Sequence, residues 1–143
     1  MTVKAILKAK GSDVVTIEPS ATIAAAVKRL AEHRIGALVV HGPDKRVVGI
    51  ISERDIVFVL AERGAGILGD PVSQVMTRKV VSCGLAETVS SVMERMTAGK
   101  FRHVPVIEEN RLAGIISIGD VVKHRLGEIE RETAALRDYI LTA

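Results

Sequence analysis

The chain contains the same seven-residue pattern twice, and this internal repeat constrains the fold more than any other feature. GIISERD occupies residues 49–55 and GIISIGD occupies residues 114–120. Equivalent positions lie 66 residues apart early in the repeat and 65 apart at its end, where Asp55 aligns with Asp120. The lost residue falls where GPDKR in the first half becomes EENR in the second, a composition typical of loops. The sequence therefore predicts two copies of one structural unit.

Each half follows the order β-α-β-β-α. A short β-rich run precedes a helical stretch with apolar residues at i, i+3, i+4 and i+7, and a predicted hairpin and second helix follow. In the first half these segments are VVTI (14–17), TIAAAVKRLAEH (22–33) and ALVVH with VVGII. In the second half they are VVSC (80–83), TVSSVMERMTAG (88–99) and VPVI with LAGII. Thr22 and Thr88 are predicted helix N-caps, and Gly99 is a predicted C-cap.

Neither half is large enough to be stable by itself. A unit of about 60 residues buries only about 60% of its unfolded surface, so the two copies are predicted to pack as a pair. The expected fold is α/β (α+β), with repeats at 10–66 and 76–126 in one compact module. A short helix is predicted at 3–8 and an amphipathic helix at 127–143. The apolar side chains of the C-terminal helix would either cover the edge of the core or contact a second copy. They are Ile129, Leu136, Tyr139 and Ile140.

Composition argues against several classes of function. Aromatic residues make up only 2% of the chain, the net charge is +3 and no Lys/Arg run is present, which disfavours nucleic-acid binding. The four histidines and the single Cys83 show no metal-ligand spacing. Without a Ser/His/Asp set or paired carboxylates, we expect a protein that is not an enzyme and holds no metal. Short apolar runs and the lack of a signal sequence predict a cytoplasmic protein without a membrane span.

One glycine-rich segment matches a nucleotide motif only in its letters. GAGILG, at residues 64–69, has the spacing of the dinucleotide G-x-G-x-x-G pattern. That pattern requires a preceding strand, whereas the preceding RDIVFVLAER is predicted to be helical. These glycines are therefore predicted to end a helix and link the two halves.

The repeated motif itself admits two interpretations. Ser52 with Asp55, and Ser117 with Asp120, have the S-x-x-D spacing of a capping box, which would satisfy backbone N–H groups at a helix start. The same geometry can bind a nucleotide, because a helix N-terminus attracts phosphate and an ionised aspartate can accept the hydroxyls of a ribose. Capping alone does not account for the glycine at a fixed position before each serine. A glycine there allows something to approach the backbone closely.

The duplicated unit ending in GIISERD and GIISIGD resembles a pair of cystathionine-β-synthase (CBS) domains, also called a Bateman module. The resemblance covers roughly residues 10–126. It implies a pseudo-two-fold pair of repeats that binds adenosyl compounds in two clefts between them, and pairing of two modules into a homodimer. It further implies a regulatory module rather than an enzyme.

The resemblance assigns residues to each cleft. In one cleft Asp120 would hold the ribose, Ser117 the phosphate and the backbone of Ile115 the adenine. The residues expected from the opposite half are Lys10, Val15, Ile35, Gly36 and Ala37. Arg102 and His103 match basic phosphate contacts of the family and are expected in this same cleft. The residues expected in the other cleft are Ile50, Ser52 and Asp55, with Met76, Val81 and Phe101 from the second half.

Several alternatives stay open at this point. Gly36 and Ala37 stand where the second repeat has Arg102 and His103, so the two clefts are predicted to be unequal. Arg102 also fits a solvated residue before a strand, and His103 a structural histidine. AMP, ADP, ATP, NAD(H) and S-adenosylmethionine all carry the adenosine that the clefts would bind. The leading hypothesis is a stand-alone sensor acting on a separate protein, and its rival is a structural homodimer with empty clefts.

Overall fold

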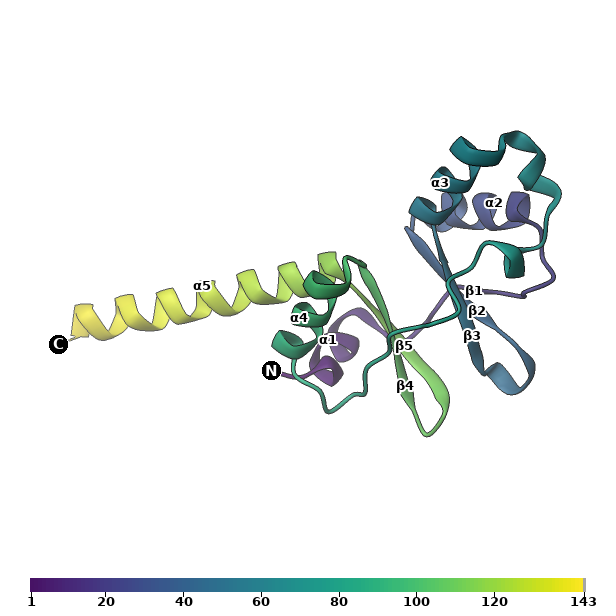
Figure 1. The fold of residues 1–143 in the computed structure, drawn as a ribbon. Helices are drawn as coiled ribbons and strands as arrows, with labels where there is room; N and C mark the ends of the chain where they lie inside the picture. The colour runs from purple at the N-terminus through teal and green to yellow at the C-terminus, as the bar shows by residue number, and fades with distance from the viewer. Residues whose placement is uncertain (143) are drawn as a thin grey trace.

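The computed structural model describes residues 1–142 and contains two similar α/β units side by side (Figure 1). The helices and strands are α1 (Val3–Lys10), β1 (Thr16–Ile17), α2 (Ile23–His33), β2 (Ala37–His41), β3 (Val47–Ser52), α3 (Glu53–Arg63), α4 (Val89–Gly99), β4 (His103–Glu108), β5 (Arg111–Ser117) and α5 (Ile118–Thr142). Short 3₁₀ turns lie at Pro43–Lys45, Ala65–Gly69 and Val72–Gln74. This order confirms the predicted duplication.

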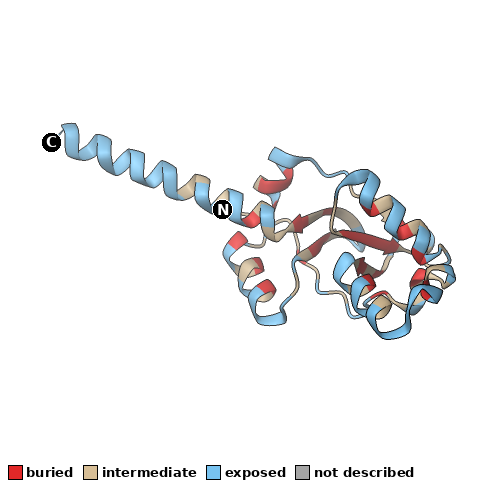
Figure 2. Ribbon diagram, turned by 90° about the horizontal axis from the view of Figure 1, so that it is seen from above, coloured by how far each residue is buried: buried red, intermediate tan, exposed pale blue. Residues whose placement is uncertain are grey.

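The first repeat is built on a three-stranded sheet. β1 pairs with β2 in parallel, and β2 pairs with β3 in an antiparallel hairpin that places Val39 opposite Ile50. All of β2 except its last residue is buried, whereas β3 alternates between buried and partly exposed residues. The sheet therefore presents one face to α2 and α3, whose apolar sides complete the core (Figure 2).

The second repeat has only a two-stranded sheet, the antiparallel hairpin β4–β5. The predicted β-rich run VVSC does not form a strand. It contributes one isolated parallel bridge between Cys83 and Val106, because only Cys83 exchanges backbone hydrogen bonds there, with Pro105 and Ile107. The first-half equivalent VVTI is also shorter than predicted and pairs only at Thr16–Ile17.

The two cores cross the repeat boundaries predicted from the sequence. Val3, Ile6 and Leu7 of α1 are buried in the core of the second repeat, with α4, β4 and β5. Conversely, Val72, which precedes the predicted second repeat, and Met76, which opens it, are buried in the core of the first. Each repeat is thus completed by the segment that precedes the other repeat in the chain.

The C-terminal helix is longer than predicted. The sequence predicted a helix at 127–143 separate from the second repeat, but α5 runs unbroken from Ile118 to Thr142, with Gly127 inside it. Val121 anchors its first turns in the core, and the rest projects away from both repeats (Figure 1). The last residue of the predicted helix, Ala143, lies outside the described residues.

The predicted helix caps are confirmed at the N-termini. The side chain of Thr22 accepts a hydrogen bond from the backbone of Ala25 at 3.1 Å, and Thr88 accepts one from Ser91 at 3.2 Å. The predicted C-cap at Gly99 is wrong: Lys100 takes the left-handed conformation, with φ 57°, and Gly99 is the last helical residue. Position 99 requires glycine for a different reason: a Cβ atom there would collide with the ring of Phe101.

GAGILG connects the repeats as predicted. α3 ends at Arg63, and Gly64 follows with φ 78°, a left-handed value that favours glycine. A 3₁₀ turn over Ala65–Gly69 then leads toward the second repeat. No helix among residues 1–142 is long and apolar enough to cross a membrane.

Candidate functional site

The two copies of the repeated motif form the same hydrogen bonds at the start of α3 and α5. In the first copy, Asp55 Oδ2 accepts from the Ser52 backbone N–H at 2.9 Å, and Ser52 Oγ accepts from the Asp55 N–H at 3.2 Å. In the second, the corresponding distances between Ser117 and Asp120 are 2.9 and 3.1 Å. The predicted capping box is therefore confirmed in both repeats.

The glycines before each box are explained by close contacts within the protein. A Cβ atom on Gly49 would lie 2.6 Å from Met76 Sδ and 3.0 Å from the backbone O of Thr77. One on Gly114 would lie 2.7 Å from a methyl carbon of Leu7. Each glycine thus admits the completing segment of its repeat, so the close approach predicted from the sequence is made by the chain itself.

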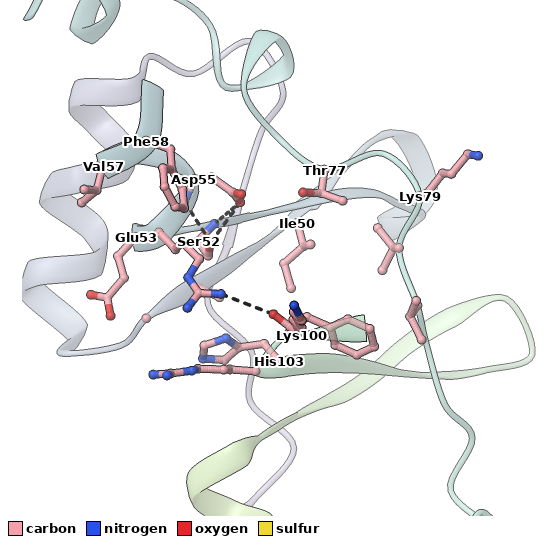
Figure 3. Close-up of a pocket in the computed structure, with 17 residues that line it drawn as sticks. Ile50, Ser52, Glu53, Asp55, Val57, Phe58, Thr77, Lys79, Lys100 and His103 are labelled. Atoms are coloured by element: carbon pink, nitrogen blue, oxygen red, sulfur yellow. Dashed lines mark hydrogen bonds between the residues drawn. The ribbon is translucent and has the colours of Figure 1, made fainter. Parts of the chain in front are cut away.

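A cavity of about 560 Å³ opens beside the first box (Figure 3). Its walls come from β2, β3 and the start of α3 in the first repeat, and from two segments of the second half, at 77–81 and 100–103. The lining residues are Gly36, Ala37, Ile50, Ser52, Glu53, Arg54, Asp55, Val57, Phe58, Thr77, Lys79, Val80, Val81, Lys100, Phe101, Arg102 and His103. We call this cavity the Asp55 pocket.

The Asp55 pocket combines an apolar surface with an excess of positive charge. Its aliphatic and aromatic lining comes from both halves of the chain. Its four Lys and Arg residues, against the two carboxylates of Glu53 and Asp55, are Arg54, Lys79, Lys100 and Arg102. Arg54 is held across the pocket by a hydrogen bond from Nη1 to the backbone O of Lys100, at 3.4 Å. Such a mixture suits a ligand with both an apolar ring and anionic groups.

The second box has a different environment. Lys10, at the end of α1, donates from Nζ to Asp120 Oδ2 at 2.6 Å and to the backbone O of Ile115 at 2.9 Å. Burial alone would raise the pKa of the Asp120 carboxyl. The hydrogen bonds from Lys10 and from Ser117 outweigh burial, so the pKa lies below its ordinary value. Asp120 is therefore ionised and already paired with a cation.

The structure brings together only part of each predicted cleft. Lys10, Ile115, Ser117 and Asp120 meet as expected. Four residues expected beside Asp120 line the Asp55 pocket: Gly36, Ala37, Arg102 and His103. Two of them also adjoin the second box, because His103 pairs with Ser117 in the β4–β5 hairpin and the backbone O of Arg102 accepts from the Ile118 N–H at 2.8 Å.

The other predicted residues divide between the pocket and the core. Ile50, Ser52, Asp55, Val81 and Phe101 line the Asp55 pocket as predicted. Met76 is buried in the core of the first repeat, against Gly49. Val15 and Ile35 are partly buried against that same core.

His103 lies at the junction between the two repeats. Its ring contacts the first repeat at Gly36, where a Cβ atom would be 3.2 Å from His103 Cε1. Burial lowers the pKa of the His103 imidazole below its ordinary value. Glu53 and Asp120 oppose this effect, while the positive charges of Lys10 and Arg102 reinforce it. His103 therefore favours its neutral form in the free protein.

Several pocket residues were missed by sequence reasoning. Lys79 gave no signal in the sequence, because the offset of 66 residues aligns Lys10 with Met76, and the equivalence of Leu7 and Met76 is seen only in their contacts with Gly114 and Gly49. Lys100 adjoins Phe101, which the prediction included. Val57 and Phe58 gave no signal, because apolar residues on a helix are usually core residues, yet here they are 62% and 67% exposed.

The lining of the Asp55 pocket suits ligand binding. Within residues 1–142, no group of three His, Cys, Asp or Glu side chains could hold a metal ion. Cys83, the one thiol, is buried in the core of the second repeat, and burial raises its pKa to about 11, which Arg95 only partly offsets. The Asp55 pocket presents the N-terminus of α3, the carboxylate of Asp55 and four Lys and Arg side chains to a ligand.

The chain belongs to the CBS domain family, whose model matches residues 3–62 and 72–127. A CBS-domain containing protein from Agrobacterium tumefaciens, whose structure is solved, is 52% identical with a TM-score of 0.85, and the match covers 87% of this chain and 99% of that one. These comparisons confirm the predicted family and fold class.

Two solved neighbours contain adenosyl ligands. The CBS domain pair of protein MJ0100, in complex with 5′-methylthioadenosine and S-adenosyl-L-methionine, is 28% identical with a TM-score of 0.80, covering 90% of this chain and 98% of that one. A CBS domain protein from Pyrobaculum aerophilum, complexed with AMP, is 28% identical with a TM-score of 0.74, covering 84% and 89%.

The chain spans 66% of the length of a curated relative from Acidianus ambivalens, an uncharacterized 17.7 kDa protein that is 40% identical over 111 residues.

Proposed function

We propose that this protein is a regulatory module that binds an adenine nucleotide in the Asp55 pocket. The observation that carries the proposal is the first capping box, which opens onto a cavity with apolar and cationic walls from both repeats. The adenosyl ligands of the two solved neighbours support this class of ligand.

The residues of the pocket have separate roles in this proposal. Both Ser52 hydrogen bonds to Asp55 end on Oδ2, so Oδ1 is the oxygen that a ribose hydroxyl would approach. Ser52 and the N-terminal turn of α3 would face a phosphate, which the helix dipole attracts. The adenine would lie against the aliphatic residues Ile50, Val80 and Val81, which all line the cavity.

The cationic wall favours phosphorylated ligands over plain adenosine. Arg102 from the second repeat and Arg54 from the first both line the pocket, and a guanidinium can form two parallel hydrogen bonds to one phosphate. A ligand held by both residues would link the two repeats. We propose that this link changes the affinity of the protein for a separate partner, without any catalytic step.

The proposal selects one of the two clefts that the sequence-based hypothesis assigned, the one at Asp55 rather than the one at Asp120. In the structure, the Lys10 ammonium lies 2.6 Å from Asp120 Oδ2, so an internal ion pair already balances the charge of that carboxylate. Asp55 has no ion pair among the described residues, so its charge is available to a ligand.

Two matched variants test the assignment by titration calorimetry with AMP, ATP, NAD and adenosine. Asp55→Asn should weaken nucleotide binding by about 10- to 100-fold, corresponding to about 1.5–3 kcal/mol for a hydrogen bond to a charged group. Asp120→Asn is the control, because asparagine preserves capping in both boxes, and it should change the affinity by less than about twofold. A loss confined to Asp120→Asn would move the site to the second box. Binding that neither variant changes, or a nucleotide panel without any thermal shift, would leave capping as the role of both boxes.

A second candidate function, homodimerisation, is favoured by an apolar groove between α2 and α3. The groove is lined mainly by aliphatic residues, namely Val27, Leu30, Ala31, Ile35, Ile56, Val57 and Leu60. Val27 and Val57 are 40% and 62% exposed, so this face offers apolar surface to a second copy. Light scattering tests it: a monomeric mass at micromolar concentration would contradict this candidate.

A further inference from the structure

The outer half of α5 exposes apolar side chains that no other part of the chain covers within residues 1–142. From Ile129 to Thr142 every residue is exposed, and the helix extends away from both repeats (Figures 1 and 2). Leu136 is 61% exposed and Ile140 is 66% exposed. A solvated helix has no need of large aliphatic residues at these positions, so their spacing is informative.

Six positions of α5, five of them aliphatic, follow an alternating spacing of four and three. The positions are Val122, Leu126, Ile129, Thr133, Leu136 and Ile140. This is the a/d spacing of a coiled coil, with a at 126, 133 and 140 and d at 122, 129 and 136. The seam spans about 27 Å at 1.5 Å per residue. Thr133 is the one polar residue in it.

We propose that α5 pairs with α5 of a second copy as a parallel, in-register, two-stranded coiled coil. The charges beside the seam support this arrangement. In a parallel coiled coil, each g residue faces the e residue five positions later in the other helix. Arg125 (g) then faces Glu130 (e), and Glu132 (g) faces Arg137 (e), so all of these pairs are attractive.

The antiparallel arrangement is disfavoured by the same residues. An antiparallel pair with matched seams brings e against e and g against g. Glu130 would face Glu130 of the second copy, and Glu132 would face Glu132. Lys123 would face Arg137, so every charged pair becomes repulsive. The sequence therefore specifies one orientation of the pair.

The paired charges have few alternative partners within the helix. Arg125 Nη1 lies 3.4 Å from Glu128 in its own helix, a weak exposed contact. Neither Glu132 nor Arg137 has an oppositely charged residue three or four positions away. Exchanging charges at 132 and 137 should therefore act between helices rather than within one.

The seam is compatible with the rest of the structure. Val121 faces the core and is fully buried, whereas its neighbour Val122 on the seam is 47% exposed. The seam thus lies beside the face of α5 that packs on the second repeat. The Asp55 pocket has no lining residue from α5, so the coiled coil and nucleotide binding can be tested independently.

Charge exchange tests the orientation in the full-length protein. Arg137→Glu should weaken self-association by about tenfold in sedimentation equilibrium, because both symmetry-related pairs with Glu132 become repulsive. Combining it with Glu132→Arg should restore the association. An antiparallel pair would instead tighten with Arg137→Glu, because the new carboxylate would then face Lys123. Tighter association of Arg137→Glu would overturn the proposal. An equal molecular mass in solution for wild type and Leu136→Asp would also overturn it.

Disulfide formation gives a second, geometric readout. Ile140→Cys places a thiol in the seam, and Leu141→Cys places one beside it, at an outer position that is 77% exposed. Under mild oxidation, a covalent dimer should form at least about tenfold faster from the first variant. Cys83 does not interfere, because it is buried. Equal rates for the two variants would contradict a parallel seam.

Discussion

The two capping boxes have nearly the same internal hydrogen bonds, yet one faces a cavity and the other holds a lysine. The difference arises in the segments that complete each repeat. Leu7 and Lys10 are three residues apart in the helix α1, so both lie toward the same face, and Leu7 contacts Gly114 while Lys10 reaches Asp120. Met76 and Lys79 have the same spacing, but they lie in a non-helical segment of bends, so the geometry that places positions three apart on one face of a helix does not hold there. Lys79 therefore lines the pocket without pairing with Asp55.

This difference shows that a repeated motif does not determine its own function. The same S-x-x-D pattern is a binding candidate in one repeat and part of an internal ion pair in the other. Local backbone conformation in a neighbouring segment decides which. The comparison can be sharpened by changing the equivalent residues of the two repeats one pair at a time.

The largest effect is expected at the two buried glycines. Gly49→Ala would place a Cβ atom 2.6 Å from Met76 Sδ and 3.0 Å from the backbone O of Thr77. Backbone cannot move aside cheaply, so we expect a loss of about 1–3 kcal/mol in the free energy of unfolding. Gly114→Ala meets only the methyl groups of Leu7, so its cost should be near the lower limit, about 1 kcal/mol. Urea denaturation of both variants measures the difference, and equal losses would show that the two contacts are equivalent.

A smaller effect is expected from the ion pair of the second box. Lys10→Met should raise the pKa of Asp120, because the largest favourable hydrogen bond to its carboxylate is lost. Asp120 stabilises the wild type above the unfolded-state pKa of about 3.9, and this contribution is lost as the pH falls through the lower folded-state pKa. The variant should therefore be less stable at neutral pH, by under about 1 kcal/mol, and at acidic pH below both values the difference should shrink to what the Lys10 hydrogen bond to the Ile115 carbonyl contributes.

The control is Lys79→Met, the equivalent change in the first repeat. Because Lys79 has no ion pair among the described residues, this variant should unfold at the same urea concentration as the wild type at every pH. A stability difference for Lys10→Met that persists unchanged in acid would mean that packing of the lysine stem, rather than its charge, is responsible.

A change of a few-fold is expected from His103. Burial lowers the pKa of the His103 imidazole in the free protein. His103 therefore destabilises the fold only when the pH falls below the pKa of an unfolded histidine, about 6.5. A phosphate in the Asp55 pocket would favour the protonated ring, so AMP binding should strengthen relative to adenosine as the pH falls from 8 to 6. Protonation of the AMP phosphate, whose second pKa is about 6, weakens binding at low pH, but it affects wild type and His103→Gln equally. Calorimetry on wild type and His103→Gln isolates the histidine, and identical AMP-to-adenosine ratios at every pH would make it structural.

The smallest effect concerns a position where the repeats differ in chemistry but not in packing. Cys83 occupies the place that Ile17 has in the first repeat, and both are buried. Burial raises its pKa to about 11, so the thiol should not react with a thiol reagent at about pH 8 until urea unfolds the protein. Rapid reaction of the folded protein would reveal opening of the second core.

The fold could be predicted from the sequence to the extent that local patterns determine it. The spacing of Thr22 and Thr88 before amphipathic runs correctly located two helix starts, and the hairpins were found from apolar strands around turn residues. The continuity of α5 was missed because the predicted repeat ended at residue 126 and the helix after it was assigned separately from residue 127, with Gly127 at the boundary. Helix hydrogen bonds tolerate a single glycine at a cost of about 1 kcal/mol.

The candidate site was less predictable because its contacts are distant in sequence. Lys10 and Asp120 are 110 residues apart, and no local rule pairs them. Arg102 and His103 were singled out as basic residues before a strand, but the sequence did not show that they also line the Asp55 pocket. The direction in which a strand start faces depends on the packing of the two repeats, which a pattern along one chain does not contain.

The exchange of completing segments also affects the order in which the protein can fold during synthesis. α1 emerges from the ribosome before the other described elements, but its apolar residues Val3, Ile6 and Leu7 belong to a core whose other members begin at Cys83. The first repeat can close once Val72 and Met76 have emerged, while α1 is still without its partners. α1 must therefore remain exposed, or be shielded by a chaperone, while the residues up to Cys83 and beyond are made. Of the described helices and strands, α1 is thus made before the rest and is among the last to be buried.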